Sequence, residues 1–381
     1  MATTNEFDDI RPRLDEEVPA TIERLLQDIE FQKVIARLFP GRKKEEMEGW
    51  VRSFRTKRDF QHQLVKDLVY SVVGKASDSI DSAGYENIRK DTAYTYISNH
   101  RDIVLDAALI CVMLITAGYD TVEIAIGDNL LARPWIEDLV RLNKSFIVKR
   151  GVGIREMLEV SNHLSKYIHY TIKEKNESVW IAQREGRAKD SDDHTQESVV
   201  KMLAMGGGKD FLASIRELNI VPVSLSYEYD PCDFLKAKEF QQKRDNPDFK
   251  KTKEDDLLNM QTGIFGYKGR IHFQFGCSIA SELDKLDAST PKTELAQAIA
   301  AIIDREIYRN YHFYPVNYWA YDQLENSRRF VGKYTLADVG KIENYFSKQL
   351  DKIDLPDKDI PFLTQKMMEM YANPVRNQLK L

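Results

Sequence analysis

Cysteine is scarce in this sequence, and none of it is arranged for a disulfide framework or a zinc site. The three cysteines, Cys111, Cys232 and Cys277, are odd in number and widely spaced, and no CxxC pair occurs. This spacing argues against structural disulfides and zinc, and it is typical of a protein in a reducing compartment. We therefore expect neither a disulfide framework nor a bound metal.

The sequence also lacks a strong excess of one charge and a long apolar run. Its formal net charge is -5, and no arm rich in Lys and Arg alternates with aromatics, so nucleic-acid binding is not expected. The stretch MATTNEFDDIRPRLDEE is acidic and polar, unlike a secretory signal. The longest apolar stretch, residues 103–117, is interrupted by Asp106 and is shorter than the roughly 20 residues of a spanning helix. We expect a cytoplasmic protein that associates peripherally with a membrane surface.

Three regions differ in how their apolar residues are spaced. Residues 1–90 predict a helical N-terminal region, because VPATIERLLQDIEFQKVIARLF and MEGWVRSFRTKRDFQHQLVKDLVYSVV have helical spacing. In residues 91–285, short β-rich segments alternate with helical ones, which predicts an α/β domain with a mostly parallel sheet flanked by helices. Residues 286–381 predict a mostly helical C-terminal extension.

Two surface features have two interpretations each. The excess of Lys and Arg between residues 42 and 58 fits a solvated helical face or a patch for an anionic membrane. The aromatic cluster from Tyr308 to Tyr321 fits a core or interface, or a membrane-interface belt.

A His-Arg-Asp triplet lies between two apolar runs in YTYISNHRDIVLDAALICVMLI, residues 94–115. Charged groups beside a core are costly unless paired. If a strand precedes the triplet and a helix follows it, His100 lies in the turn and Asp106 faces back toward it. A carboxylate on one ring nitrogen would let the other take a proton from a hydroxyl. Alternatively, His100 completes a strand end and Asp102 caps the helix.

Basic residues stand at the ends of two later predicted strands. KSFIVKR ends in Lys149 and Arg150, and VWIAQREGRAKD runs into the charged turn 184–187. Sites in α/β sheets lie where strands end, and guanidinium groups gathered there would bind a phosphate or another anionic group. Taken singly, each residue could instead be an exposed surface charge.

Together these segments resemble the ordered motifs of the glycerolipid acyltransferases, which acylate glycerol-3-phosphate or lysophosphatidate. The four matching segments, in order, are NHRDIVLD (99–106), SFIVKR (145–150), EGR (185–187) and VPVSLSY (221–227). GRIHFQFG (269–276) then resembles the strand that closes these domains. The resemblance covers about residues 94–280 and implies an acyltransferase-like α/β fold.

The chain departs from the family pattern in three places. Five residues rather than four separate His100 from Asp106, so Asp102 is an alternative partner for His100. In the third motif Arg187 follows Glu-Gly directly, and Gln-Arg stands where the family has Phe-Pro. After the closing Phe-Gly, Cys-Ser replaces Glu-Pro. These departures affect which Asp is catalytic and which acceptor is bound more than they affect the expected fold.

The resemblance implies an O-acyltransferase that moves a fatty acyl chain from acyl-CoA or acyl-ACP to a hydroxyl of glycerol-3-phosphate, lysophosphatidate or a similar lysolipid. His100 would be the general base, with Asp106 as its partner. Backbone N–H groups around Glu185 and Gly186 would stabilise the oxyanion. No cofactor and no metal are implied beyond the acyl thioester. The expected substrate-binding residues are Arg101, Lys149, Arg150, Glu185, Gly186 and Arg187.

Two other functions are compatible with the same residues. A metal-dependent hydrolase could use His100, Asp102 and Asp106, but no second His/Asp cluster supplies further ligands. A non-catalytic protein that binds lipid or acyl carrier on the same fold is supported by the extra residue in the first motif.

Overall fold

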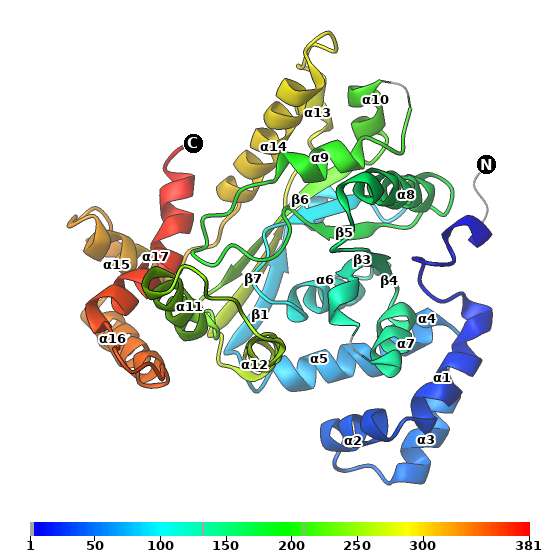
Figure 1. The fold of residues 1–381 in the computed structure, drawn as a ribbon, viewed down its shortest axis with the longest axis horizontal. Helices are drawn as coiled ribbons and strands as arrows, with labels where there is room; N and C mark the ends of the chain where they lie inside the picture. The colour runs from blue at the N-terminus through cyan, green and yellow to red at the C-terminus, as the bar shows by residue number, and fades with distance from the viewer. Residues whose placement is uncertain (1–3, 132, 209) are drawn as a thin grey trace.

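A seven-stranded β-sheet forms the centre of the molecule (Figure 1). The computed structural model describes residues 4–131, 133–208 and 210–381. Across the sheet the strand order is β1-β7-β6-β2-β5-β3-β4. The strands are β1 (Ser79–Ala83), β2 (Thr95–Ser98), β3 (Glu123–Gly127), β4 (Ser145–Val148), β5 (Val179–Ala182), β6 (Ile220–Tyr227) and β7 (Arg270–Phe275).

Most of the strands run in one direction. β2 is parallel to β5 and β6, and β3 is parallel to β4 and β5. β7 is antiparallel to β6, and β1 is parallel to β7. The carboxyl ends of β6, β2, β5, β3 and β4 therefore meet at one edge of the sheet, which we call the carboxyl edge. The predicted α/β fold with a mostly parallel, helix-flanked sheet is confirmed.

Helices cover both faces of the sheet, and the strands alternate between the two cores. In β5, Val179 and Ile181 belong to one core and Trp180 to the other. α8 (Ile154–Lys173), α9 (Glu197–Leu203), α10 (Phe211–Arg216) and α14 (Lys292–Arg309) cover the first face. α5 (Lys66–Val73) and α6 (Leu105–Thr116) cover the second. The sequence of α6 is apolar nearly all round because the helix is buried.

The N-terminal helices pack together beside the sheet. α1 (Val18–Gln27), α2 (Ile29–Leu38) and α3 (Lys44–Arg52) share a core with α7 (Pro134–Leu142). A helical run follows, formed by α4 (Lys57–Asp59), the π-helical η3 (Phe60–Val65) and α5. The helical prediction for residues 1–90 is wrong near its end, because β1 joins the sheet beside β7. β1 is a short polar edge strand, SIDSA, so its sequence has no apolar alternation to detect.

The C-terminal extension is joined to the sheet domain by two cores. α14 packs on the sheet, while α15 (Pro315–Leu324), α16 (Leu336–Asp351) and α17 (Ile360–Gln378) pack with α11 (Asp233–Asp245). α11 and α12 (Lys253–Phe265) lie between β6 and β7 in the chain, and α13 (Ala280–Leu283) follows β7. The packing therefore crosses the predicted division between residues 285 and 286 (Figure 1).

Within the ranges described, no helix is long and apolar enough to cross a membrane. Much of the basic excess between residues 42 and 58 is paired with carboxylates. Arg52 pairs with Glu23, and Lys57 pairs with Asp15. This pairing favours a solvated helical face over a patch for an anionic membrane.

Candidate active site

His100 lies just beyond the end of β2, in the middle of the carboxyl edge. The side chain of Asn99 donates to the carbonyl of Leu225 at 2.9 Å and accepts from its N–H at 2.8 Å. The amide of Asn99 thus continues the pairing of β2 with β6 past the point where the strand ends. The turn that carries His100 is fixed to the sheet as a result.

Asp106, on the first turn of α6, points back at His100. Its Oδ2 lies 2.8 Å from His100 Nδ1 and accepts the backbone N–H groups of Arg101 at 2.6 Å and Asp102 at 3.0 Å. Its Oδ1 accepts the hydroxyl of Tyr227 at 2.9 Å. A carboxylate only accepts, so Nδ1 donates to it, and in the neutral imidazole Nε2 then has the lone pair.

Asp102 has a different role from Asp106. Its carboxylate accepts the N–H groups of Val104 at 2.9 Å and Leu105 at 2.7 Å, which caps the start of α6. It makes no hydrogen bond to His100 among the residues described. The extra residue in the first motif is therefore accommodated in the turn, and Asp106 remains the carboxylate that contacts the imidazole.

The imidazole of His100 packs against an aromatic wall and keeps one nitrogen free. Trp180 of β5 meets it edge-to-face, with ring centroids 5.8 Å apart, and donates its own N–H to Ser98. The His100 side chain is 15% exposed. In the described part of the chain Nε2 has no hydrogen-bond partner, so it is available to a ligand.

Arg150 extends across the carboxyl edge from the end of β4. Its side chain passes over Gly127, where an added Cβ would lie 2.7 Å from Nε. It then reaches Glu185, which follows β5, with 3.7 Å between the charged groups. The structure therefore brings together two predicted substrate-binding residues, and both are substantially exposed.

The turn that contains Glu185 and Gly186 is open. Gly186 has a φ of +67° and no neighbour within 4 Å of an added Cβ. The backbone N–H of Glu185 donates to Gln196 at 2.8 Å, so it is not available to an oxyanion. The N–H of Gly186 has no such partner among the described residues. Arg187 lies further in, where Nη1 approaches the carbonyl of Arg101 at 3.5 Å.

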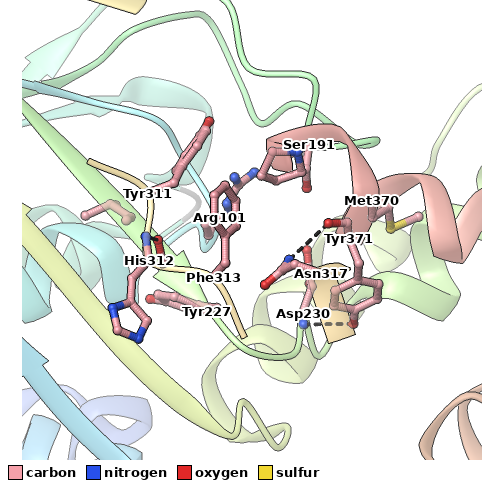
Figure 2. A pocket seen from close by; sticks show the side chains of 13 residues that line it. Arg101, Ser191, Tyr227, Asp230, Tyr311, His312, Phe313, Asn317, Met370 and Tyr371 are labelled. Atoms are coloured by element: carbon pink, nitrogen blue, oxygen red, sulfur yellow. Dashed lines mark hydrogen bonds between the residues drawn. The ribbon is translucent and has the colours of Figure 1, made fainter. Parts of the chain in front are cut away.

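Arg101, predicted to bind the acceptor, is engaged inside the protein. Its guanidinium bonds both oxygens of Asp193, at 3.3 and 2.7 Å, and its side chain is 8% exposed. Tyr311 donates to the same carboxylate at 2.7 Å. Figure 2 shows Arg101 among Tyr227, Tyr311 and the α17 residue Tyr371, on the side of the C-terminal helices. Arg101 thus links the His100 turn to the extension.

Lys149 contacts the N-terminal segment rather than the other predicted substrate-binding residues. Its Nζ lies 2.7 Å from Asp9 in the N-terminal segment, and Asp9 also binds His163 at 2.9 Å. Partial burial raises the pKa of Asp9, but Lys149 and His163 outweigh this effect and hold the pKa below its ordinary value. Lys149 therefore connects β4 to the N-terminal segment.

The sequence alone assigns no role to several residues that shape this site. Tyr227 is the last residue of the VPVSLSY motif, and its contact with Asp106 depends on the pairing of β6 with β2. Burial, and then the Asp106 carboxylate, raises the pKa of Tyr227 well above its ordinary value, so its hydroxyl stays protonated and donates. The sequence does not indicate a role for Asp193, because its partner Arg101 is distant in sequence.

No group of three or more His, Cys, Asp or Glu side chains suited to a metal ion occurs in the ranges described. The three residues of the hydrolase alternative do not converge on one point. Asp102 binds backbone N–H groups, while Asp106 binds the ring of His100.

The comparison with protein families gives a direct match to this part of the chain. The Acyltransferase family model matches residues 79–226, from the start of β1 almost to the end of β6. Residues 79–226 are thus similar to the Acyltransferase family. The match confirms the resemblance drawn from the four motifs. His100, Arg150 and Glu185, which lie on the carboxyl edge, all fall within the matched segment, and α11 to α17 lie outside it.

Other comparisons are more distant. No curated protein matches the chain. Among solved structures, the 1-acyl-sn-glycerophosphate (LPA) acyltransferase PlsC from Thermotoga maritima is similar over 75% of this chain and 91% of its own. The identity is 13% and the TM-score is 0.38, which is too low to transfer residue roles.

Proposed function

We propose that this acyltransferase moves a fatty acyl chain from acyl-CoA or acyl-ACP to a hydroxyl of glycerol-3-phosphate, lysophosphatidate or a similar lysolipid. The observation that carries the proposal is the 2.8 Å contact between His100 Nδ1 and Asp106, which leaves Nε2 free at the carboxyl edge. A histidine held in one tautomer by a buried carboxylate is suited to general-base chemistry.

In the proposed reaction, Nε2 of His100 removes the proton of the acceptor hydroxyl as its oxygen attacks the thioester carbonyl. Asp106 stabilises the imidazolium that forms. The N–H of Gly186 is a candidate donor to the oxyanion of the tetrahedral intermediate. Collapse of the intermediate breaks the C–S bond, and the departing sulfur takes the proton from His100. The products are an ester and a free thiol.

The anionic group of the acceptor would bind to the guanidinium groups at this edge. Arg150 and Arg187 remain candidates, with Glu185 bonding an acceptor hydroxyl or orienting Arg150. Arg184 is a further candidate, because its Nε is buried without a partner in the described ranges. If the alternation of β5 continues, Arg184 lies on the His100 side of the sheet, as Trp180 does. Arg101 binds Asp193 and Lys149 binds Asp9, so these two residues would hold neighbouring segments in place rather than contact the acceptor.

The acyl chain and the membrane surface would lie at the apolar margin of the site. Met157 and Leu158, near the start of α8, are 50% and 66% exposed, and Val104 before α6 is 38% exposed. α8 follows directly on the loop after Arg150. Exposed apolar residues beside a polar site suit contact with an acyl chain or a bilayer surface. We propose a cytoplasmic protein associated peripherally with the membrane.

Release of thiol from long-chain acyl-CoA and acyl-ACP tests the function, with glycerol-3-phosphate or lysophosphatidate as acceptor and with or without chelator. We expect chelator-insensitive turnover that falls by about 10²- to 10⁴-fold in His100→Ala. Asp106→Asn should also lose activity. Asp102→Ala should chiefly lower stability, by about 1 kcal/mol, because it removes a helix cap.

His163→Ala is the matched control, because it removes the ring of another His–Asp pair, outside the site. Turnover that is equally reduced in His163→Ala and His100→Ala would contradict the assigned base. Absence of turnover with every donor and acceptor would favour a non-catalytic binding protein.

A further inference from the structure

A groove of about 680 Å³ lies between α16, the end of α12 and the turn that follows β6. We call it the α16 groove. Apart from Asp78, its lining comes from residues 228–352, outside the segment that matches the acyltransferase family. The groove is therefore a feature of this chain's own additions to the domain.

One wall of the groove is basic. Lys341, Lys348 and Lys352 line it from α16 and the residue that caps its end. Lys341 and Lys348 are seven residues apart, so they lie on one face, about 10 Å apart along the axis. Within the described ranges, neither makes a salt bridge or hydrogen bond, although Lys341 interacts electrostatically with Asp338. Lys352 bonds the neutral side chain of Gln349 and lies over the ring of Phe234. The carboxylates of Asp78, Glu228 and Asp338 also line the groove, but Glu228 pairs with Arg270 and Asp78 accepts from Tyr267. Lys348, which has no carboxylate partner in the described ranges, favours an anionic ligand.

The floor of the groove is aromatic. Tyr229, Tyr267 and Tyr345 line it, and the ring of Tyr229 lies 4.1 Å from that of Tyr345 and 5.8 Å from that of Tyr267. Tyr267 is 46% exposed and is held by a 2.7 Å bond to Asp78. Fixed aromatic surface beside cations suits a ligand that joins a planar ring to phosphates.

The α16 groove is close to the active site. Tyr227 contacts Asp106, and Tyr229 lines the groove two residues later. Two residues span at most about 7 Å. α12, whose last turns line the groove, also packs on the turn beside His100, because an added Cβ on Gly263 would lie 2.2 Å from Asp102. A ligand with a flexible arm could occupy both places.

We propose that the α16 groove binds the nucleotide end of coenzyme A, with its phosphates on the α16 lysines and its base against the tyrosines. This rests on the proposed function and names CoA, rather than a carrier protein, as the donor. The thioester at the end of the pantetheine arm would then lie at His100.

Calorimetric titration of the full chain with adenosine 3′,5′-bisphosphate tests the groove without requiring turnover. We expect saturable binding that is at least tenfold weaker in Lys348→Glu and unchanged in His100→Ala. Lys333→Glu is the matched control, because Lys333 is an exposed lysine outside the groove. In assays with acyl-CoA, Lys348→Glu should raise KM with little change in kcat.

Absence of saturable binding, or equal weakening by Lys348→Glu and Lys333→Glu, would overturn the assignment. The result also separates the two proposals. If acyl transfer proceeds but the bisphosphate does not bind, the groove assignment fails and the function stands. If the bisphosphate binds with the expected lysine dependence but no acceptor is acylated, the function fails and the nucleotide site stands.

Discussion

At the scale of single residues, the Asp106 carboxylate organises the proposed base. It is fully buried and accepts from the His100 ring, two backbone N–H groups and the Tyr227 hydroxyl. The negative charge that holds the His100 tautomer is therefore shared with Tyr227, a residue outside the His-Arg-Asp segment.

Tyr227→Phe should lower kcat by about tenfold. The substitution removes one hydrogen bond to a charged group, which contributes about 1.5 kcal/mol, and that energy corresponds to about a factor of ten. KM should change little, because Tyr227 contacts Asp106 rather than a substrate. Measurement of kcat and KM separately checks both effects.

Tyr334→Phe is the matched control, because Tyr334 donates to Asp322 in the C-terminal extension. A kcat that falls no further in Tyr227→Phe than in Tyr334→Phe would show that Tyr227 only fills space.

At the scale of elements, the His100 turn is held between a strand, a helix and a loop from different parts of the chain. Asn99 ties it to β6, Asp102 caps α6, and Arg101 binds Asp193 in the loop after β5. α12 lies close against this turn at Gly263. These contacts hold the base in place while its own side chain remains partly exposed.

Gly263→Ala should destabilise the protein by about 1–3 kcal/mol, because the new methyl group would overlap Asp102, a buried side chain with little room to move. The loss should exceed the small gain in helix propensity. Urea unfolding measures the change in the free energy of unfolding.

Gly49→Ala provides the comparison, since Gly49 lies in α3 with no neighbour within 4 Å of an added Cβ. It should stabilise by up to about 1 kcal/mol. Equal effects of the two substitutions would show that α12 does not press on the turn.

At the scale of the whole molecule, buried polar groups join the C-terminal helices α16 and α17 to α11, which follows β6. Asp233, at the start of α11, accepts the hydroxyl of Tyr371 at 2.6 Å and the side-chain amide of Gln349 at 2.5 Å. Burial, opposed by these hydrogen bonds, raises the pKa of Asp233 to about 7. The attachment of α16 and α17 therefore includes a group that titrates near neutral pH.

The stability of the protein should depend on pH through Asp233. Its pKa in the folded protein, about 7, lies above the ordinary value of 3.8, so the folded state binds the proton more tightly. This stabilisation is complete below about pH 4 and is lost as pH rises through about 7. The free energy of unfolding of the native protein, minus that of Asp233→Asn, should fall from pH 4 to pH 8.

Denaturant unfolding at several pH values measures this difference. Asp351→Asn, which alters an exposed carboxylate at the end of α16, is the comparison variant. A difference for Asp233→Asn that is constant between pH 4 and pH 8 would contradict the raised pKa.

The sequence by itself determined the features that depend on local pattern. Alternating strands and helices predicted the parallel sheet, because each segment's apolar spacing reflects the faces it buries. The spacing from His100 to Asp106 placed the carboxylate on the first turn of a helix, and the observed 2.8 Å contact agrees with that geometry. The order of the motifs led to the acyltransferase family.

Only the tertiary structure decided which charged residues meet. It separated Asp102 from Asp106, turned Arg101 toward Asp193 and Lys149 toward Asp9, and brought Arg150 to Glu185. It also added β1 to the sheet and formed the α16 groove from distant segments. These partners lie far apart in sequence, and a charged side chain at a strand end carries no local signal of the partner it meets.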